Sequence, residues 1–264
     1  MIVEGEGMTQ AERRIFLIQK LLDEQSRYQG APIPRDETEQ KNLLRSLMNI
    51  RAPKSIGGEF LTVQDEYLRE ETAAKGITDF ADLSPISNGI YLWRGHITTL
   101  RCGAIVNAAN SGMTGCYQPC HNCIDNCIHT YAGVQLRLKC AELMKEQGYE
   151  EPTGQAKITP AYNLPCQYVI HTVGPIVQGG LTKRHCKLLA SCYHSCLKLA
   201  DENDVESIAF CCISTGVFMF PNDKAAEIAV QTVKEYKAET GSQIEVIFNV
   251  FKDADYQIYR DLLG

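Results

Sequence analysis

The stretch GCYQPCHNCIDNCIHTYAG, residues 115–133, gathers side chains that can do chemistry: four cysteines, two histidines and one aspartate. Cys116, His121 and Cys123 form a C-x4-H-x-C pattern, and thiolates with an imidazole are ligands that zinc prefers. Three protein ligands would leave a tetrahedral position open, whereas four would close the site into a structural one. Because the spacing matches no familiar zinc finger, the pattern alone favours a metal site and buried inert cysteines equally.

The same stretch offers further candidates. Cys120 and Cys127 are spare ligands, and Asp125 and His129 lie one turn apart on one face of an expected helix. A lone aspartate at a helix start is more often a cap, and a lone histidine is more often a packed side chain. Together beside a metal they become candidates for catalysis.

A second stretch, ISTGVFMFPNDKAAEIAV at residues 213–230, resembles a phosphate cradle. Small residues, Ser214, Thr215 and Gly216, lead to Pro221 at an expected helix start, so backbone N–H groups could approach an anion there. The alternative is an ordinary turn between a strand and a helix.

Alternating elements must position these two stretches. Short β-branched and aromatic runs predict strands IYLWRG, AIVNAAN, YVIHTVG, SIAFCCIS and IEVIFNVF. Helices are expected after His121, Thr182, Pro221 and Asp253. This alternation predicts α/β layering around a buried, largely parallel sheet. Both stretches then follow strands, at the edge of the sheet where ligands bind in such folds.

The first 80 residues have a different character. Apolar residues recur at helical spacing among charges in three pieces separated by prolines. We expect residues 1–80 to form a helical N-terminal extension packed on a main domain of residues 81–264, because the pieces are short for an independent core.

Composition narrows the functional classes. The 264 residues are 44% hydrophobic with a formal net charge of −6 and a pI near 5.6, so no broad basic field favours nucleic acid as a partner. Twelve cysteines in a chain of this size, with no apolar run behind the start, predict a reducing cytoplasmic location rather than a disulfide framework. No run is long enough to predict a membrane span.

Four segments together resemble the signature segments of macrodomains, which bind or hydrolyse ADP-ribose: LWRGHITTLRCGAIVNAAN, AYNLPCQYVIHTVGP, CCISTGVFMFP and VIFNVFKDADYQIY. The cysteine-rich loop is similar to that of the zinc-dependent microbial branch. The resemblance implies a three-layer α/β/α macrodomain with a mixed, largely parallel central sheet, preceded by the helical extension.

The resemblance also implies roles for residues. Cys116, His121 and Cys123 would hold Zn²⁺. Asn110 would lie by the distal ribose and Asp125 near the scissile bond. His129, one turn after Asp125, is the further catalytic candidate that the helical spacing gives. The implied binding residues are His96, Ile97, Asn110, Ser214, Thr215, Gly216, Val217, Phe218 and Phe251.

Two departures from the family pattern stand out. The segment usually read as GDIT is GHIT here, so His96 replaces an aspartate that accepts a hydrogen bond from adenine, and a neutral imidazole is a weaker acceptor than a carboxylate. Met219 stands where many relatives have glycine.

The function implied by the resemblance is zinc-dependent removal of mono-ADP-ribose from a modified protein. The linkage would be an ester to Asp or Glu, on a target such as a lipoyl-carrier protein modified by a sirtuin-type transferase. The alternative is a non-catalytic ADP-ribose reader whose zinc is structural.

Overall fold

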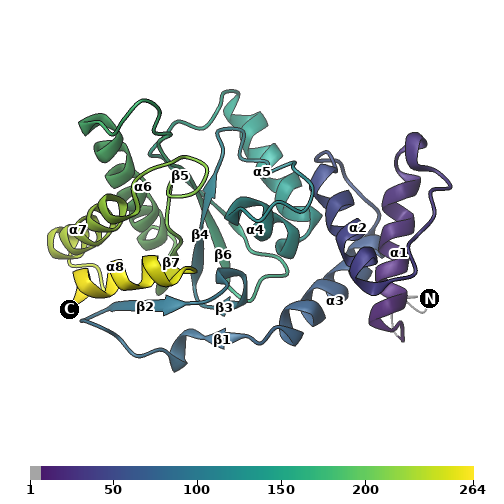
Figure 1. Cartoon of the computed structure of the whole chain (residues 1–264), viewed down its shortest axis with the longest axis horizontal. Coiled ribbons are helices and arrows are strands. Elements are labelled where there is room, and N and C mark those ends of the chain that lie inside the picture. Colours follow the sequence, from purple (N-terminus) through teal and green to yellow (C-terminus); the bar gives the residue numbers. More distant parts are fainter. Residues whose placement is uncertain (1–6) are drawn as a thin grey trace.

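The computed structural model describes residues 7–264, and its first part is three helices, α1 (Gln10–Asp23), α2 (Glu37–Ile50) and α3 (Gly58–Ala74). Thr9 begins α1 with a capping box, in which its side chain and that of Glu12 each accept a backbone N–H. The helices bury a hydrophobic cluster of their own, which Val134 of the following part joins (Figure 1). The three helical pieces are confirmed, and the boundary at residue 80 stays a prediction.

The central sheet has six strands in the order β2-β8-β7-β4-β6-β5. Their bounds are β2 Ile90–Arg94, β4 Ala104–Ala109, β5 Ala156–Pro160, β6 Tyr168–Val173, β7 Ser207–Phe210 and β8 Glu245–Val250. All neighbours are parallel except β5, which pairs antiparallel with β6 at the edge. The five predicted strands are confirmed, and β5 is an addition. A separate two-stranded pair joins β1 (Thr78–Asp79) to β3 (Leu100–Arg101).

Helices cover both faces of this sheet. The remaining helices are α4 Ile124–Ala132, α5 Val134–Gln147, α6 Lys183–Asp201, α7 Asn222–Thr240 and α8 Asp253–Leu263. α6, α7 and α8 pack in series on one side, and α4 and α5 lie on the other side, toward the N-terminal helices (Figure 1). The predicted three-layer α/β/α architecture with a mixed, largely parallel sheet is thereby confirmed.

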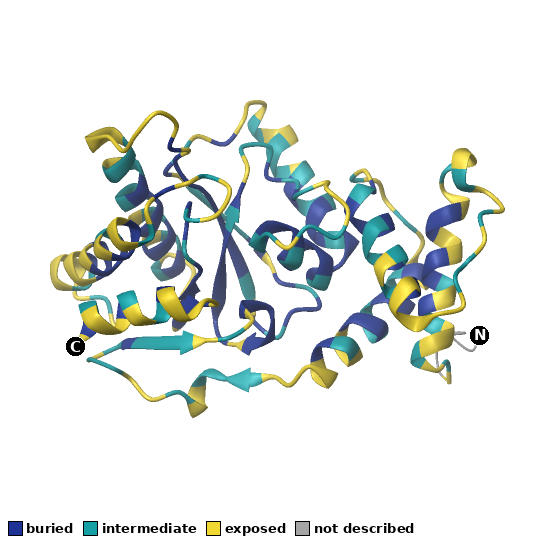
Figure 2. Ribbon diagram, viewed as in Figure 1, coloured by how far each residue is buried: buried dark blue, intermediate teal, exposed yellow. Residues whose placement is uncertain are grey.

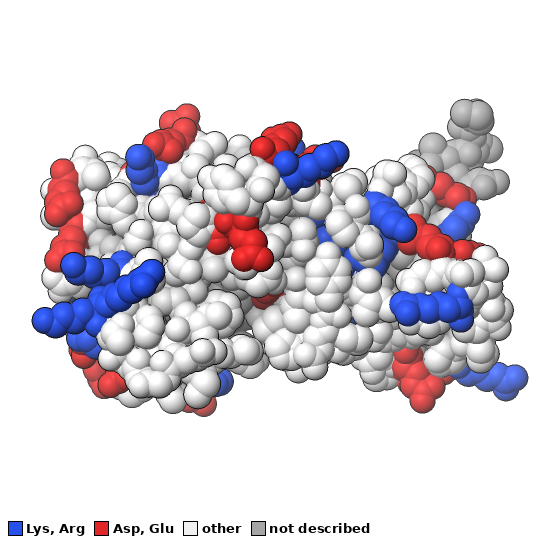
Figure 3. Space-filling view, turned by 90° about the horizontal axis from the view of Figure 1, so that it is seen from above, with Lys and Arg blue, Asp and Glu red and all other residues white. Residues whose placement is uncertain are grey.

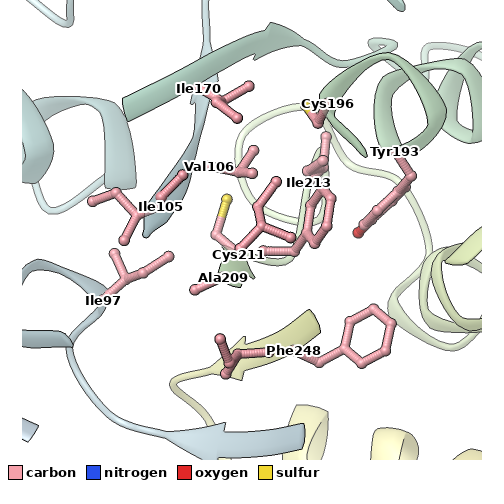
Figure 4. Packing of buried hydrophobic residues seen from close by; sticks show 14 of the residues in the cluster. Ile97, Ile105, Val106, Ile170, Tyr193, Cys196, Ala209, Cys211, Ile213 and Phe248 are labelled. Carbon is pink, nitrogen blue, oxygen red and sulfur yellow. The ribbon is translucent and has the colours of Figure 1, made fainter. Parts of the chain in front are cut away.

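The main core lies between these layers. Figure 2 shows the strands buried and the connecting loops exposed, as expected for a sheet covered on both faces. Side chains from β4, β6, β7 and α6 meet in the core, including Val106, Ile170, Ala209 and Cys196 (Figure 4). All twelve cysteines lie in the described residues, and none of them forms a disulfide.

None of the helices within residues 7–264 combines the length and the apolar character that crossing a membrane requires.

Candidate active site and metal loop

The two chemically promising loops leave neighbouring strands. β4 and β7 pair in parallel, so their carboxyl ends lie side by side. The chain after β4 runs to α4 on one face of the sheet, and the chain after β7 runs to α7 on the other. In open α/β sheets, ligands usually bind at the edge where the connections from adjacent strands diverge to opposite faces.

Asp125 is buried in the first turn of α4 and does not cap it. The N-cap is Cys123, whose Sγ accepts from the Asn126 N–H at 3.4 Å. The Asp125 carboxylate instead accepts from Asn107 Nδ2 at 2.8 Å and from Asn110 Nδ2 at 3.3 Å. Burial raises the pKa of Asp125 to about 6, although these hydrogen bonds and the charge of Arg137 oppose the rise. The amides of Asn107 on β4 and of Asn110 just after it therefore fix the carboxylate.

Asn107 extends this contact deeper into the sheet. Asn107 on β4 is in register with His171 on β6, and its Nδ2 lies 3.1 Å from His171 Nδ1. His171 Nε2 lies 3.0 Å from Thr159 Oγ1 on β5. Complete burial lowers the pKa of His171 to about 3, so the ring is neutral. Since an amide nitrogen only donates, His171 Nδ1 must accept from Asn107 Nδ2, and Nε2 must carry the proton toward Thr159.

His129 lies beside this chain of hydrogen bonds. Its Nε2 is 3.5 Å from Asp125 Oδ1, as the helical spacing predicts. Within residues 7–264 neither ring nitrogen has a hydrogen-bond partner, and burial lowers the pKa of His129 well below its usual range. A neutral imidazole thus faces the buried carboxylate.

The metal loop brings its three predicted ligands together. The ligand atoms of Cys116, His121 and Cys123 all lie within 4.8 Å of one another, and Cys116 Sγ is 3.6 Å from His121 Nδ1. Zinc bonds of about 2.0–2.3 Å at tetrahedral angles separate neighbouring ligand atoms by about 3.6 Å. The three side chains are partly exposed, so a metal ion held by them would lie near the surface rather than in the core.

The spare cysteines serve other contacts. Cys120 Sγ lies 3.2 Å from Ser46 Oγ, and Cys127 Sγ lies 3.7 Å from Arg45 Nη2, both on α2. Neither sulfur belongs to the group of metal-ligand atoms. The three-ligand arrangement with an open fourth position is therefore the one that the geometry favours.

A second group of metal-type atoms is fully internal. His129, Cys140 and His171 also place ligand atoms within 4.8 Å of one another and could hold a metal ion. Both nitrogens of His171 already have polar neighbours, Asn107 and Thr159. These neighbours satisfy the hydrogen-bonding groups of the His171 ring without a bound ion.

The loop after β7 has the shape of a cradle. Ser214 and Met219 adopt left-handed backbone conformations, with φ of 65° and 57°. Such values favour glycine, so Ser214 and Met219 hold these conformations at a cost that a glycine would not have. The Phe220 N–H donates back to Ser214 O at 3.0 Å and closes the loop. Among the described residues, the backbone N–H groups at 216–218 have no acceptor, as an anion-binding loop requires.

Glycine lets this cradle approach the end of β6. A Cβ on Gly174 would overlap Ser214 Oγ and come within 2.9 Å of Ile213 Cγ2. The Val177 N–H then donates to Phe218 O at 2.9 Å, which ties the tip of the loop to the segment after β6.

His96 and Phe251 lie together at the ends of β2 and β8. Their ring centroids are 4.9 Å apart with planes inclined by 54°, and Phe251 is 65% exposed. Two adjacent exposed rings suit stacking on a flat base. Ile97 differs from the other predicted binding residues because its side chain is buried in the core (Figure 4). Only its backbone could therefore contact a ligand.

Seen from above, the middle of the face that carries these loops is mainly uncharged apart from a group of acidic side chains, and both basic and acidic side chains lie around it (Figure 3). Backbone N–H groups are therefore the principal donors available to a diphosphate there.

Sequence reasoning singled out Asn110, Asp125 and His129 but missed Asn107 and His171. Their contact follows from the pairing of two strands 64 residues apart. The polar residues in two otherwise apolar strands, AIVNAA and YVIHTV, were the available signal, since buried polar groups need partners.

Comparison with known proteins identifies the fold family. The Macro domain family model matches residues 106–229. A protein-ADP-ribose hydrolase of Treponema medium is 64% identical over 261 residues, which cover 97% of this chain and all of the relative. A protein-ADP-ribose hydrolase of Staphylococcus aureus strain MSSA476 is 53% identical over 221 residues, 83% of each chain.

Solved macrodomain structures are also similar to this chain. The Trypanosoma brucei macrodomain in complex with ADP-ribose is 28% identical with a TM-score of 0.64, and the match covers 83% of this chain and 95% of that one. The Oceanobacillus iheyensis macrodomain with ADP is 35% identical with a TM-score of 0.61, covering 69% and 93%. The resemblance inferred from the four sequence segments is confirmed: the chain belongs to the macrodomain family of protein-ADP-ribose hydrolases.

Proposed function

We propose that this hydrolase is zinc-dependent and removes mono-ADP-ribose from a modified protein by cleaving the bond at C1 of the distal ribose. The observation that carries the proposal is the position of Asp125. Its carboxylate is held by the amides of Asn107 and Asn110, and it lies two residues after Cys123 of the metal loop. A fixed carboxylate next to a cation site is an arrangement that hydrolysis of a glycosidic bond can use.

The donor set fits zinc, with Cys116, His121 and Cys123 as ligands and a fourth position open. When bound, zinc polarises a coordinated oxygen or lowers the pKa of a bound water toward neutrality.

The remaining chemistry falls to the side chains. Asp125 orients the attacking water and accepts its proton while the water oxygen bonds to C1 and the bond from C1 to the side-chain oxygen breaks. The electron pair leaves with the released carboxylate of the target protein. His129, 3.5 Å from Asp125 Oδ1, is close enough to take part in handling that proton. The oxocarbenium-like transition state gains from the nearby negative charge.

Asn110 positions rather than reacts. Its Nδ2 donates to Gly115 O at 3.1 Å and to Asp125, and its Oδ1 accepts from the Gly112 N–H at 3.0 Å. An amide oxygen keeps a second lone pair, which can accept from a ribose hydroxyl. Asn110 thereby links the loop, the carboxylate and the sugar.

The other predicted binding residues would contact the diphosphate, the distal ribose and the base of the substrate. The loop of Ser214, Thr215, Gly216, Val217 and Phe218 would wrap the diphosphate and the distal ribose, with the backbone N–H groups at 216–218 as donors to the diphosphate. His96 and Phe251 would stack on the base, with a weaker acceptor for its amino group than a carboxylate provides.

The substrate that we propose is a protein carrying mono-ADP-ribose as an ester on Asp or Glu. A lipoyl-carrier protein modified by a sirtuin-type transferase is the proposed target. Family membership supports hydrolysis over the alternative of a reader with a structural zinc.

The test compares Asp125→Ala with Asp223→Ala on ester-linked and serine-linked mono-ADP-ribosylated proteins, with release of ADP-ribose as the readout. Asp223 is a matched control because it is also in the first turn of a helix, α7, but is exposed. We expect Asp125→Ala to lower kcat on the ester by about 10²–10⁴ with its circular dichroism unchanged, and Asp223→Ala to behave as wild type. Equal rates for both variants would overturn the proposed role, and preference for the serine linkage would overturn the ester assignment.

A further inference from the structure

We propose that α2 of the N-terminal extension clamps the metal loop and so sets its affinity for zinc, with Arg45 as the principal positioning residue. The proposal rests on the proposed function, because it takes the loop of Cys116, His121 and Cys123 to be the zinc site. The face concerned presents Asn42, Arg45, Ser46 and Asn49, which recur at helical spacing. Figure 1 shows α2 beside α4, the helix that the loop enters.

Arg45 binds the backbone of a ligand residue. Its Nη2 donates to His121 O at 2.7 Å and to Asn126 Oδ1 at 3.0 Å. Asn126 is fully buried, and its Nδ2 donates back to Cys116 O at 3.3 Å and to Gln118 O at 2.9 Å. One guanidinium thus supports the carbonyl of His121 directly and that of Cys116 through Asn126.

Asn49 and Ser46 hold the residue next to His121. The Cys120 N–H donates to Asn49 Oδ1 at 3.0 Å, while Asn49 Nδ2 donates to Thr130 Oγ1 of α4 at 2.9 Å. Cys120 Sγ lies 3.2 Å from Ser46 Oγ and donates to Asn42 O at 3.4 Å. Cys120 has a φ of 52°, which a non-glycine residue adopts only at a cost, and its contacts with α2 hold it there.

Arg137 of α5 secures the other end of the loop against α2. Its buried guanidinium donates from Nη1 to the carbonyl oxygens of Met48, Asn49 and Arg51 at 2.6–3.1 Å. Its Nε donates to Thr114 O at 2.8 Å, just ahead of the first zinc ligand. The last carbonyls of α2 and the start of the metal loop therefore share one cation.

These contacts matter because the loop has no regular structure of its own. Residues 111–123 form only turns and bends, so three ligands spread over eight residues must be held in position by other elements. A loop that is ordered before the metal arrives loses less conformational freedom on binding it. Hydrogen-bonded supports around metal ligands typically change metal affinity by about 10–100-fold.

The experiment measures the zinc Kd of the full chain by competition with a chromophoric chelator. It compares the wild type with Arg45→Ala, Arg45→Lys and the control Lys41→Ala. Lys41 is on the same helix but pairs with Glu37 and Glu71, away from the loop. We expect zinc to bind Arg45→Ala about 10–100-fold more weakly, Arg45→Lys in between because one donor is restored, and Lys41→Ala as wild type.

A purely structural role would lower the unfolding temperature of the metal-free protein without changing the zinc Kd. An unchanged zinc Kd in folded Arg45→Ala would therefore overturn the clamp. If Arg45→Ala does not fold, Arg45→Lys decides by the same measurement. Failure of the wild type to bind zinc would overturn the proposed zinc site itself, so the two failures are distinguishable.

Discussion

The loops after β4 and β7 leave neighbouring strands, yet they are held in different ways. The loop after β4 is fixed by side chains from three helices, including Arg45, Asn126 and Arg137. The loop after β7 is closed by its own backbone, and its tip residues Val217 and Met219 are each 72% exposed. If the proposed roles hold, the difference sets a preorganised reaction centre beside a binding loop that is tied only at Phe218 and exposes apolar side chains on either side of it.

The largest expected effect comes from removing a metal ligand from the fixed loop. Cys123→Ala should lower turnover by more than about 100-fold, because loss of a ligand exceeds the effect of losing a supporting hydrogen bond. ADP-ribose affinity, which depends mainly on the other loop, should change little. Steady-state kinetics measure the turnover, and isothermal titration calorimetry measures the ADP-ribose affinity. Turnover that survives in a folded Cys123→Ala protein would contradict the proposed metal site.

The next largest effect is expected from Asn107, which supports Asp125 from β4 and belongs to neither loop. Asn107→Leu leaves Asp125 Oδ1 and His171 Nδ1 buried without their donor. An unsatisfied buried acceptor costs about 1–3 kcal/mol, so the free energy of unfolding should fall by at least that amount, and kcat should fall more than KM rises. Urea denaturation and kinetics measure both. If only stability changes, Asn107 does not position the carboxylate.

A smaller effect is expected in the binding loop. Gly174→Ala should displace Ser214, since the new Cβ would overlap its Oγ. ADP-ribose affinity should fall by about tenfold, the equivalent of about 1.4 kcal/mol, while kcat at saturating substrate is kept. Gly58→Ala is a suitable control for the loss of a glycine, because the space at Gly58 is open and its φ, like that of Gly174, is not positive. If kcat fell by the same factor as the affinity, the loop after β7 would act on the reaction as well as on binding.

The mildest effect is acid sensitivity of the buried cluster beneath the fixed loop. The pKa of His171 is lowered by burial to about 3, whereas the unfolded chain has its usual value of about 6.5. Below about pH 6.5 the unfolded state binds a proton that the folded state does not, so stability falls as pH falls. Because of this histidine, the free energy of unfolding should fall by about 1 kcal/mol between about pH 7 and 5.5.

Chemical denaturation at the two pH values measures this loss, and His171→Gln should reduce the slope. His129, Cys140 and Asp125 surround the same space, and the pKa of His129 is lowered in the same direction. An unchanged slope in His171→Gln would assign the acid sensitivity to other groups.

Local patterns predicted most of the fold. Strands β4 and β6 are apolar runs bounded by turns, and α1 carries an apolar stripe behind a capping threonine, so each could be recognised alone. The edge strand β5, AKITP, was missed because it is short and half-exposed and ends in proline.

The site was predictable only in part for a different reason. The metal ligands lie within eight residues, so their spacing in the sequence carries the signal. The supports of that site come from far away: Arg45 contacts His121 across 76 residues, and Asn107 meets His171 through strand register. Contacts that arise from packing and register leave no periodic trace in the sequence.

The most direct test of the central claim is turnover of an ester-linked mono-ADP-ribosylated protein by metal-stripped and zinc-reloaded enzyme. The metal loop and Asp125 together predict that stripping lowers turnover by more than about 100-fold, that zinc restores it, and that ADP-ribose binding is kept throughout. Full turnover by the stripped, folded protein would contradict the account.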